Sequence, residues 1–436
     1  MRKSNVIRSG NFTVGLAAAL LASPAMAGGL YIGEFGQPNQ GASRAGANAL
    51  AEDASTAMQN PAGVMFLDGP KTMATGIIIH SKTEFDQQEK FPGTNSAVAN
   101  NAGNGPASDG GDGGGTSVGG AFFHARPVND KWGWTFAFNS LSGAVIDYDD
   151  GSDFAGRYWA SEVELFTVGA TGGISYKFTD NFAASLHTTL SYGELDLDVY
   201  APGPFPPVGP PPYADIGEVK IEDGDDTVLS YGASAMWQVT ESLRLGTIYN
   251  SEIEYDFDSD LNLSDLPPGV TVGANVDVTY PQTLRLSATQ DLNDSLTLLA
   301  SVAWEDWSDF EDIPITTGMG TNALPRNWDD TYHFALGMRW KPDNRWTYYT
   351  GVAYDTDPTK ASDRTADMPM DEQIRISGGA TYERDNGHKI GGVLTYADYG
   401  DADIDNGGER PNGEDWTVKG DYSSNYLIFL GLNYGW

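Results

Sequence analysis

The sequence predicts an all-β protein, a 14-stranded antiparallel transmembrane β-barrel. Three observations lead to this fold class: side chains alternate with a period of two, short and long connectors take turns along the chain, and the first residues form a secretory signal. The 436 residues include 53 Gly, 21 Tyr, 18 Phe and 11 Trp. Abundant glycine and aromatic residues with few long apolar runs are more typical of strands than of helices.

Residues 1–27 are predicted to be a cleaved signal peptide. Arg2, Lys3 and Arg8 form its basic start, residues 14–22 are apolar, and Ala-Met-Ala at 25–27 provides an A-x-A cleavage site. A membrane anchor is the alternative, but this apolar stretch is about half of the ~20 residues that span a bilayer. The remaining sequence has no longer apolar run, so a secreted protein would either stay soluble or enter an outer membrane as a barrel.

Residues 28–68 are rich in small side chains and lack alternation, whereas strand-like segments begin near Lys71. The alternation is clearest in residues 131–139, 282–289, 331–341 and 425–436. In 331–341, for example, Tyr332, Phe334 and Leu336 share one face and polar or small residues occupy the other. One apolar face and one polar face suit a strand between lipid and a polar lumen.

The connectors alternate in length. The short ones, rich in Asp, Asn and Gly, lie near residues 129–130, 179–181, 240–241, 293–294, 342–344 and 385–387. The long ones cover about 86–116, 147–160, 201–224, 258–274, 308–327, 357–371 and 401–420. Short periplasmic turns and long, polar external loops are the arrangement of outer-membrane barrels, and six of one with seven of the other separate 14 strands.

Tryptophans near the strand ends predict two aromatic girdles, one at each membrane interface. Trp132, Trp340, Trp346 and Trp436 lie beside short turns, and Trp304, Trp307, Trp328 and Trp416 lie near long loops. The alternative is that these are core tryptophans of a soluble β-protein.

Composition and motifs exclude several other functions. A net charge of −35 makes nucleic acid an unsuitable partner. The absence of Cys excludes disulfides and thiolate metal sites, and the five His residues show neither metal-ligand spacing nor a G-x-S-x-G companion. We therefore predict no catalytic residue, no metal and no cofactor, and set aside an outer-membrane lipase.

The Gly- and Asp-rich run at 108–115 is predicted to be a flexible loop. The acidic loops form a solvated surface in contact with outer-membrane lipid and lipopolysaccharide, with shared divalent cations or a saline habitat as open alternatives.

Four groups of residues, in order along the chain, resemble the FadL-type family of outer-membrane transporters for long-chain fatty acids and other hydrophobic compounds. They are Gly41, Arg44-Ala45, Ala49, Asp53-Ala54 and Asn60-Pro61-Ala62; Trp304-Glu305-Asp306-Trp307-Ser308-Asp309-Phe310; Asn327-Trp328-Asp329-Asp330-Thr331-Tyr332 with Gly337 and Trp346; and Gly351-Val352-Ala353-Tyr354-Asp355. Asn-Pro-Ala is the most recognisable of them, and the resemblance covers nearly the whole chain after the signal.

The resemblance implies a monomer in the bacterial outer membrane, with residues 28–68 as an N-terminal hatch inside the lumen of a barrel formed by residues 69–436. It implies passive transport of long-chain fatty acids, with aromatic or aliphatic hydrocarbons, or a nonspecific porin, as alternatives. In the family, a kinked third strand opens the barrel wall sideways. Here Asn139, Ser140 and Gly143 interrupt the alternation of the third strand, either as such a kink or simply as its end.

Several residues are candidate ligand contacts. Leu30, Tyr31, Ile32 and Phe35 either line the floor of a binding pocket, as the family's N-terminus does, or pack against the barrel wall. Asn60, Pro61 and Ala62 are expected to hold the hatch rather than to touch ligand. The lumenal Arg244, Arg285, Arg339 and Arg375 need partners, for which the hatch acids Glu34, Glu52 and Asp53 are candidates. Alternatively one of them, or the loop residue Arg326, binds a fatty-acid carboxylate.

Overall fold

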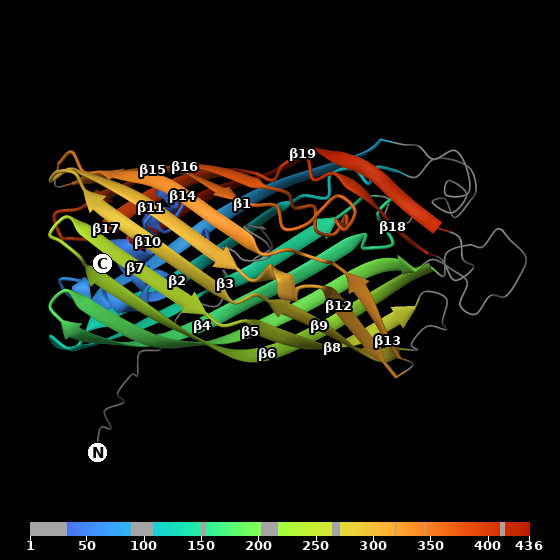
Figure 1. The fold of residues 1–436 in the computed structure, drawn as a ribbon, viewed down its shortest axis with the longest axis horizontal. Coiled ribbons are helices and arrows are strands. Elements are labelled where there is room, and N and C mark those ends of the chain that lie inside the picture. Colours follow the sequence, from blue (N-terminus) through green and yellow to red (C-terminus); the bar gives the residue numbers. More distant parts are fainter. Residues whose placement is uncertain are drawn as a thin grey trace, which may run out of the picture.

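The computed structural model describes residues 33–88, 108–149, 154–201, 217–263, 271–318, 320–343, 345–409 and 415–436. The predicted signal peptide and the candidate residues Leu30, Tyr31 and Ile32 lie outside these ranges. The described chain is an elongated barrel with one segment inside it (Figure 1). The six short turns are gathered at one end, together with the C-terminus, and the long connections at the other.

The barrel wall is a single antiparallel sheet, in which 19 strands are found within the described ranges. They are β1 (Lys71–Gln87), β2 (Thr116–Pro127), β3 (Trp132–Asp147), β4 (Glu162–Thr179), β5 (Phe182–Ala201), β6 (Gly217–Gln238), β7 (Leu243–Asn250), β8 (Ile253–Leu263), β9 (Thr271–Tyr280), β10 (Thr283–Asp291), β11 (Leu296–Glu305), β12 (Asp312–Thr317), β13 (Gly320–Pro325), β14 (Thr331–Trp340), β15 (Trp346–Asp355), β16 (Gln373–Glu383), β17 (Lys389–Asp398), β18 (Ile404–Glu409) and β19 (Asp415–Gly435).

Five pairs of consecutive strands each form one interrupted strand of the wall: β7 with β8, β9 with β10, β11 with β12, β13 with β14, and β17 with β18. This leaves the 14 barrel strands that the sequence predicts. The first and last strands pair with each other from Met73–Gly435 to Gln87–Gly420, which closes the sheet. The predicted fold class is therefore confirmed.

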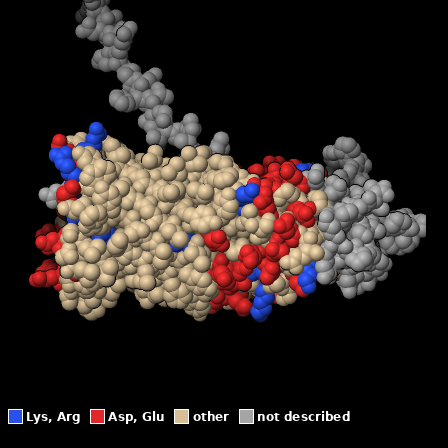
Figure 2. Space-filling model, turned by 90° about the horizontal axis from the view of Figure 1, so that it is seen from above, with Lys and Arg blue, Asp and Glu red and all other residues tan. Residues whose placement is uncertain are grey.

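The chemistry of the two faces reverses along a single strand. On β5, the outward residues change from Leu186 and Leu190, 72% and 54% exposed, to the exposed Glu194. The inward residues change in the opposite sense, from Thr189 to the buried Leu195. The first pattern suits a strand between lipid and a polar lumen, and the second suits a strand between water and an apolar core. Figure 2 shows the result on one face, an almost uncharged belt followed by an acidic zone towards the long loops.

The N-terminal part of the described chain, the hatch segment (residues 33–68), folds inside the barrel as short helical turns (Figure 1). They are η1 (Pro38–Ala42), α1 (Ala47–Leu50), α2 (Thr56–Gln59) and η2 (Pro61–Phe66). One further turn, η3 (Trp307–Asp309), lies in the wall between β11 and β12. Among the described residues, no helix has the length and apolar character needed to cross a membrane.

The hatch segment contacts strands from around the barrel, because η1 packs against β14 to β17, α1 against β7 and β10, and η2 against β2 to β6. The approach is close enough to require glycine in the wall. A Cβ atom at Gly246 would lie 1.8 Å from Asn48 O, and one at Gly351 would lie 2.2 Å from Ala42 O. The small residues of the hatch segment therefore serve close packing against the wall.

The girdle of tryptophans at the short turns is present, since Trp132, Trp340, Trp346 and Trp436 are between 39% and 48% exposed. The girdle predicted at the long loops is wrong in part. Trp307 and Trp328 are buried, and their rings pack edge to face with centroids 4.9 Å apart. They belong to an apolar core inside the lumen rather than to a lipid interface. The side chain of Trp416, the last of the four predicted at the long loops, is not among those that the structure describes.

That core, the outer apolar cluster, fills the lumen at the end of the long loops. Its buried aromatic members are Phe85, Tyr148, Phe154, Tyr158, Trp159, Tyr255, Phe257, Tyr280, Trp307, Phe310, Trp328, Tyr399, Tyr422 and Phe429. Several of the predicted external loops contribute to it, for example through Phe154 and Trp159 from one and Met368 and Met370 from another. These loops were expected to be polar and external, but their apolar residues turn inward because the lumen offers a dry surface to cover.

A charge on the lipid face should destabilise the barrel in a depth-dependent manner. Leu336 is 66% exposed and lies at the middle of β14. The change Leu336→Arg should lower the free energy of unfolding of the barrel by about 2–4 kcal/mol, measured by urea unfolding in lipid vesicles. Leu292, 54% exposed in a short turn, is the matched control, and its change to Arg should have little effect. Equal losses at both positions would contradict the assignment of the belt.

Candidate functional site

The Asn-Pro-Ala motif joins the hatch segment to the wall. Asn60 Nδ2 donates to Asn48 O at 2.6 Å and to Ala235 O at 3.0 Å, and its Oδ1 accepts from Ala62 N at 3.1 Å. Ser175 Oγ of β4 donates to Pro61 O at 2.8 Å. Pro61 itself begins η2, where its missing N–H has no helical partner to lose. One asparagine thus satisfies backbone groups of the hatch segment and of β6 together.

Ion pairs add a second set of links, and two of the predicted partners are confirmed. Arg339 of β14 pairs with Glu52, and Arg375 Nε of β16 lies 3.9 Å from Glu34 Oε1. Arg244 instead donates from Nη1 to Leu50 O at 2.8 Å. Asp53, the third predicted acid, accepts from Ser55 N and Oγ within the hatch segment at 2.8 and 2.6 Å.

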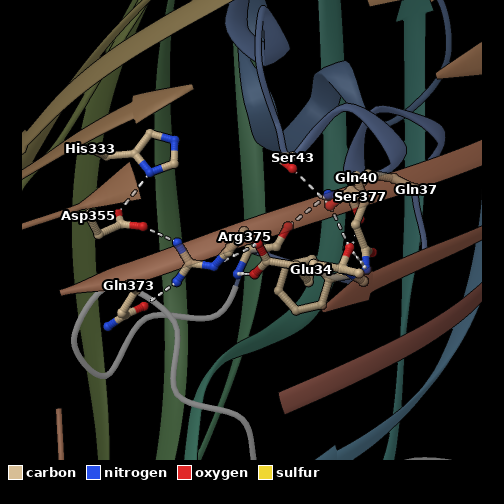
Figure 3. A network of polar contacts seen from close by, with 12 residues as sticks. Glu34, Gln37, Gln40, Ser43, His333, Asp355, Gln373, Arg375 and Ser377 are labelled. Atoms are coloured by element: carbon tan, nitrogen blue, oxygen red, sulfur yellow. Dashed lines mark hydrogen bonds and ion pairs between the residues drawn. The ribbon is translucent and has the colours of Figure 1, made fainter. Parts of the chain in front are cut away.

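A chain of buried charges crosses three neighbouring strands (Figure 3). His333 Nδ1 of β14 lies 2.8 Å from Asp355 Oδ1 of β15, and Asp355 Oδ2 accepts from Arg375 Nη1 of β16. Strand register explains the arrangement, since His333 is directly opposite Asp355, and Arg375 lies diagonally beyond it. The five side chains of this chain are largely buried: Glu34, His333, Asp355, Gln373 and Arg375.

These charges form one side of a cavity of about 160 Å³ between the hatch segment and the outer apolar cluster. Arg285, Glu305, His333, Asp355 and Arg375, from β10, β11 and β14 to β16, line one side of it. Asn139, Leu141, Thr171, His187 and Thr189, from β3 to β5, line another part of its wall, across the 14-stranded barrel. Most of the lining residues are polar or charged, so the cavity differs from the outer apolar cluster.

The wall beside Leu141 is irregular. The register between β3 and β4 shifts between Ser140 and Ser142, which makes Leu141 a bulge. The strand continues to Asp147, so the alternative that it ends at Gly143 is wrong.

Pairing between β2 and β3 is also incomplete, since within the described ranges their ladder runs only from Ala121–Asn139 to Pro127–Gly133. Beyond it, Asp147 N donates to Gly113 O at 3.2 Å, which joins the two edges again. We call the interval between these links, residues 116–120 of β2 and 140–146 of β3, the β2–β3 window. Its outer border includes the Gly- and Asp-rich run expected to be a flexible loop; there Asp112 Oδ1 accepts from Thr83 N at 3.0 Å, bonding the run to β1.

The other candidate residues lie elsewhere. Phe35, 2% exposed, packs with Ala54, Met73 and Phe123 and is not among the residues that line the described cavity. Arg326 is buried outside the cavity, where Nη2 pairs with Asp367 Oδ2 at 2.6 Å and Nη1 donates to Thr365 Oγ1 at 3.3 Å. On the charged side of the cavity, Arg285 and Arg375 were among the candidate arginines. His333 and Asp355 were not singled out, although His333 was visible as a polar residue opposite an aromatic face and Asp355 as the end of a motif.

Comparison with known proteins agrees with this architecture. The family model described as "Outer membrane protein transport protein (OMPP1/FadL/TodX)" matches residues 18–434. The chain belongs to this family. It is therefore an outer-membrane transport protein, as the sequence predicts.

Two relatives and two solved structures illustrate the similarity. The chain is 23% identical over 401 residues to the long-chain fatty acid transport protein of Escherichia coli, covering 84% of this chain and 86% of that protein. It is 24% identical over 411 residues to outer membrane protein P1 of Haemophilus influenzae, with the same coverage. The crystal structure of a Pseudomonas aeruginosa FadL homologue superposes with a TM-score of 0.83 at 21% identity, over 93% of this chain and 99% of that chain. That of the Pseudomonas putida toluene transporter TodX gives 0.67 at 14% identity, over 93% and 98%.

Loss of the Asn60 side chain should loosen the hatch segment without unfolding the barrel. Asn60→Ala removes the side-chain donor to the buried carbonyl of Asn48, at a cost of about 1–3 kcal/mol, and the additional bond to Ala235 O of the wall. Hydrogen exchange should therefore accelerate in residues 33–66 while the strands stay protected. Asn275→Ala, which removes an exposed bond to Asp256, is the control and should leave exchange unchanged. Unaltered exchange in Asn60→Ala would show that the motif does not hold the segment.

Proposed function

We propose that this protein carries long-chain fatty acids passively across the outer membrane, holding them in the lumen and releasing them sideways through the β2–β3 window. Transport by this route needs no catalytic step and no cofactor. We further propose that it acts as a monomer whose belt contacts outer-membrane lipid and whose acidic zone faces lipopolysaccharide.

The observation that carries the proposal is the meeting of cavity and window. Leu141 is the bulged residue of β3, lines the cavity and packs against the outer apolar cluster. A ligand in the lumen would therefore lie beside the part of the wall where, within the described ranges, the backbone ladder between β2 and β3 is interrupted.

Solvation favours a lateral exit for a hydrophobic ligand. Exposure of each CH₂ group to water costs about 0.8 kcal/mol, so a long acyl chain leaves an apolar cluster for lipid far more readily than for the periplasm. The hatch segment supports the same route, because its contacts with strands around the barrel obstruct a straight aqueous path such as a nonspecific porin needs. The name of the Escherichia coli relative supports fatty acids as the first ligands to test.

Closing the β2–β3 window with a cross-link should stop uptake. The chain has no Cys, so a pair of introduced cysteines reacts without background. Continuing the register beyond Ala121–Asn139 brings Gly119 opposite Leu141. Gly119→Cys with Leu141→Cys, joined by a flexible dithiol-specific reagent, should abolish uptake of labelled oleate by cells, and a cleavable reagent should restore it on reduction.

The matched control lies on the same two strands. Phe122 and Phe138 are paired in the regular ladder, so Phe122→Cys with Phe138→Cys should cross-link without changing uptake. If the window cross-link forms and oleate uptake persists, release through this part of the wall is excluded.

A further inference from the structure

The outward face of the wall carries negative charge at the outer border of the β2–β3 window. Asp112 and Asp147 are exposed there, and neither forms an ion pair within the described ranges. Lys82 of β1 lies nearby, but its charge is balanced by Glu84, whose Oε1 is 2.9 Å from Lys82 Nζ. An anion that leaves through the window is therefore repelled from the outer border.

The other end of the same face carries an unpaired positive charge. Arg126 of β2 is exposed, and its guanidinium has no hydrogen bond or ion pair in the part of the chain that the structure describes. It lies opposite Trp134, which is 39% exposed and, with Trp132, belongs to the aromatic residues near the short turns. Arg126 is thus a free cation at the periplasmic lipid interface, on a strand that forms one edge of the window.

His124 lies beside Arg126 on this face, because residues two apart on a strand point the same way. Its Nδ1 is 2.9 Å from Thr72 Oγ1 of β1, and its ring packs on Trp134 with centroids 4.9 Å apart. Thr72 can donate to Nδ1, which leaves Nε2 to carry the proton of a neutral ring. Both outward residues then offer N–H donors, which suit a carboxylate group.

The strip of wall between the window and Arg126 is uncharged and partly bare. Its outward pairs on β1 and β2 are Ile78–Val118, Gly76–Gly120, Ala74–Phe122 and Thr72–His124. A Cβ atom at Gly76 would have no atom within 4 Å, so the surface is open there. On the β3 side, the rings of Phe122 and Phe136 have centroids 6.4 Å apart. An acyl chain that lies along this strip meets apolar side chains and glycine but no charge.

The length of the strip matches one leaflet of a bilayer. Gly120, at the inner edge of the window, is six residues from Arg126, or about 20 Å along an extended strand. Because barrel strands are tilted by about 35–45°, this corresponds to about 15 Å of depth, half of the roughly 30 Å hydrocarbon core. A chain of the periplasmic leaflet covers the same depth.

We propose that Arg126, with His124 beside it, is an exit site on the lipid face that binds the carboxylate of a released long-chain acid. The acidic outer border and the free guanidinium orient the departing molecule, so its head group turns towards the periplasm while its chain lies along the strip below the window. This inference rests on the proposed function and adds where the ligand goes: into the periplasmic leaflet, head group inward.

Solid-state NMR of the full chain in phospholipid bilayers tests the site directly. Arginine is labelled with ¹⁵N and palmitate with ¹³C at its carboxyl carbon, at alkaline pH, where the carboxyl group is ionised. The carboxyl carbon should lie within about 4 Å of a guanidinium nitrogen. Arg126→Gln should remove this contact.

Arg384→Gln is the matched control, because Arg384 is an exposed arginine in a short turn and has no ion pair within the described ranges. It should leave the palmitate contact unchanged. Contacts from ³¹P to the same guanidinium, recorded in the same sample, identify the other possible occupant. A contact to phospholipid phosphate alone would show a lipid site and overturn the proposal.

Uptake by cells provides the functional readout. Arg126→Gln should slow uptake of labelled oleate about twofold to fivefold, the effect of one exposed ion pair. Uptake of labelled hexadecanol, which carries no charge, should not change. Arg384→Gln should leave both rates as in the wild type.

The absence of a palmitate contact at Arg126, unchanged oleate uptake in Arg126→Gln, or equal slowing by Arg126→Gln and Arg384→Gln would each overturn the inference. If Arg126→Gln does not fold, Arg126→Lys should exchange the guanidinium contact for one to the lysine Nζ, and its absence would be equally decisive. If the window cross-link stops oleate uptake but no palmitate contact is found, the exit site alone is refuted. A wild type that takes up no oleate counts instead against the proposed function.

Discussion

Backbone hydrogen bonding in lipid is the constraint on which this structure depends. A bilayer offers no water to unpaired N–H and C=O groups, so the wall must pair almost every backbone group with a neighbouring strand. The 14-stranded sheet does so by closing β1 on β19. The β2–β3 window relaxes this rule over a short interval, and it does so beside an internal cavity and an apolar cluster.

The lumen is organised in layers that depend on whether lipid or water surrounds the outside of the wall. At the level of the lipid belt the wall is apolar outside, so polar residues such as Thr189 and Ser191 face inward and bond to other groups of the wall. Thr189 Oγ1 lies 2.8 Å from Thr171 Oγ1, and Ser191 Oγ donates to Val228 O at 3.2 Å. Further out the wall is acidic outside, so Leu195 and Phe257 face inward and build the outer apolar cluster. The charged cavity lies at the boundary between these layers, which is a suitable place for a ligand with one polar end and one long apolar end.

Ion pairs between the hatch segment and the wall fix the position of the segment inside the lumen. Arg339 with Glu52 and Arg375 with Glu34 connect segments nearly 300 residues or more apart in sequence. Breaking either pair would leave an uncompensated buried or half-buried charge, so one position of the hatch segment inside the barrel is favoured. Small residues at the closest approaches, such as Ala42 against Gly351, allow the segment to occupy that position.

Much of the fold could be predicted because each strand carries its own signal. Alternation, short Asn/Asp/Gly turns and the four family motifs identify the barrel, its 14 strands and its aromatic girdle at the short turns without tertiary information. The irregularity at Asn139 to Gly143 was also visible, but not that β3 continues past it, because pairing with β4 is a property of two strands.

The site was harder to predict, since its residues come from strands far apart in the chain. Arg285 and His333 come together through the register of β10, β11 and β14, and the local sequence of Arg285 does not distinguish it from the other lumenal arginines. The outer tryptophans were misplaced for a related reason. A tryptophan near a long loop has the same local pattern whether it faces lipid or, like Trp307, an apolar lumen.

Solid-state NMR of the protein in lipid bilayers, recording cross-strand backbone contacts along β2 and β3, tests the central claim most directly. The account predicts contacts between Phe122 and Phe138, none between Gly119 and Leu141, and contacts from β3 to β4 on both sides of the bulge, such as Asn139–Gly169 and Gly143–Phe166. Regular β2–β3 contacts that continued from Ala121–Asn139 to the outer end of both strands would contradict it.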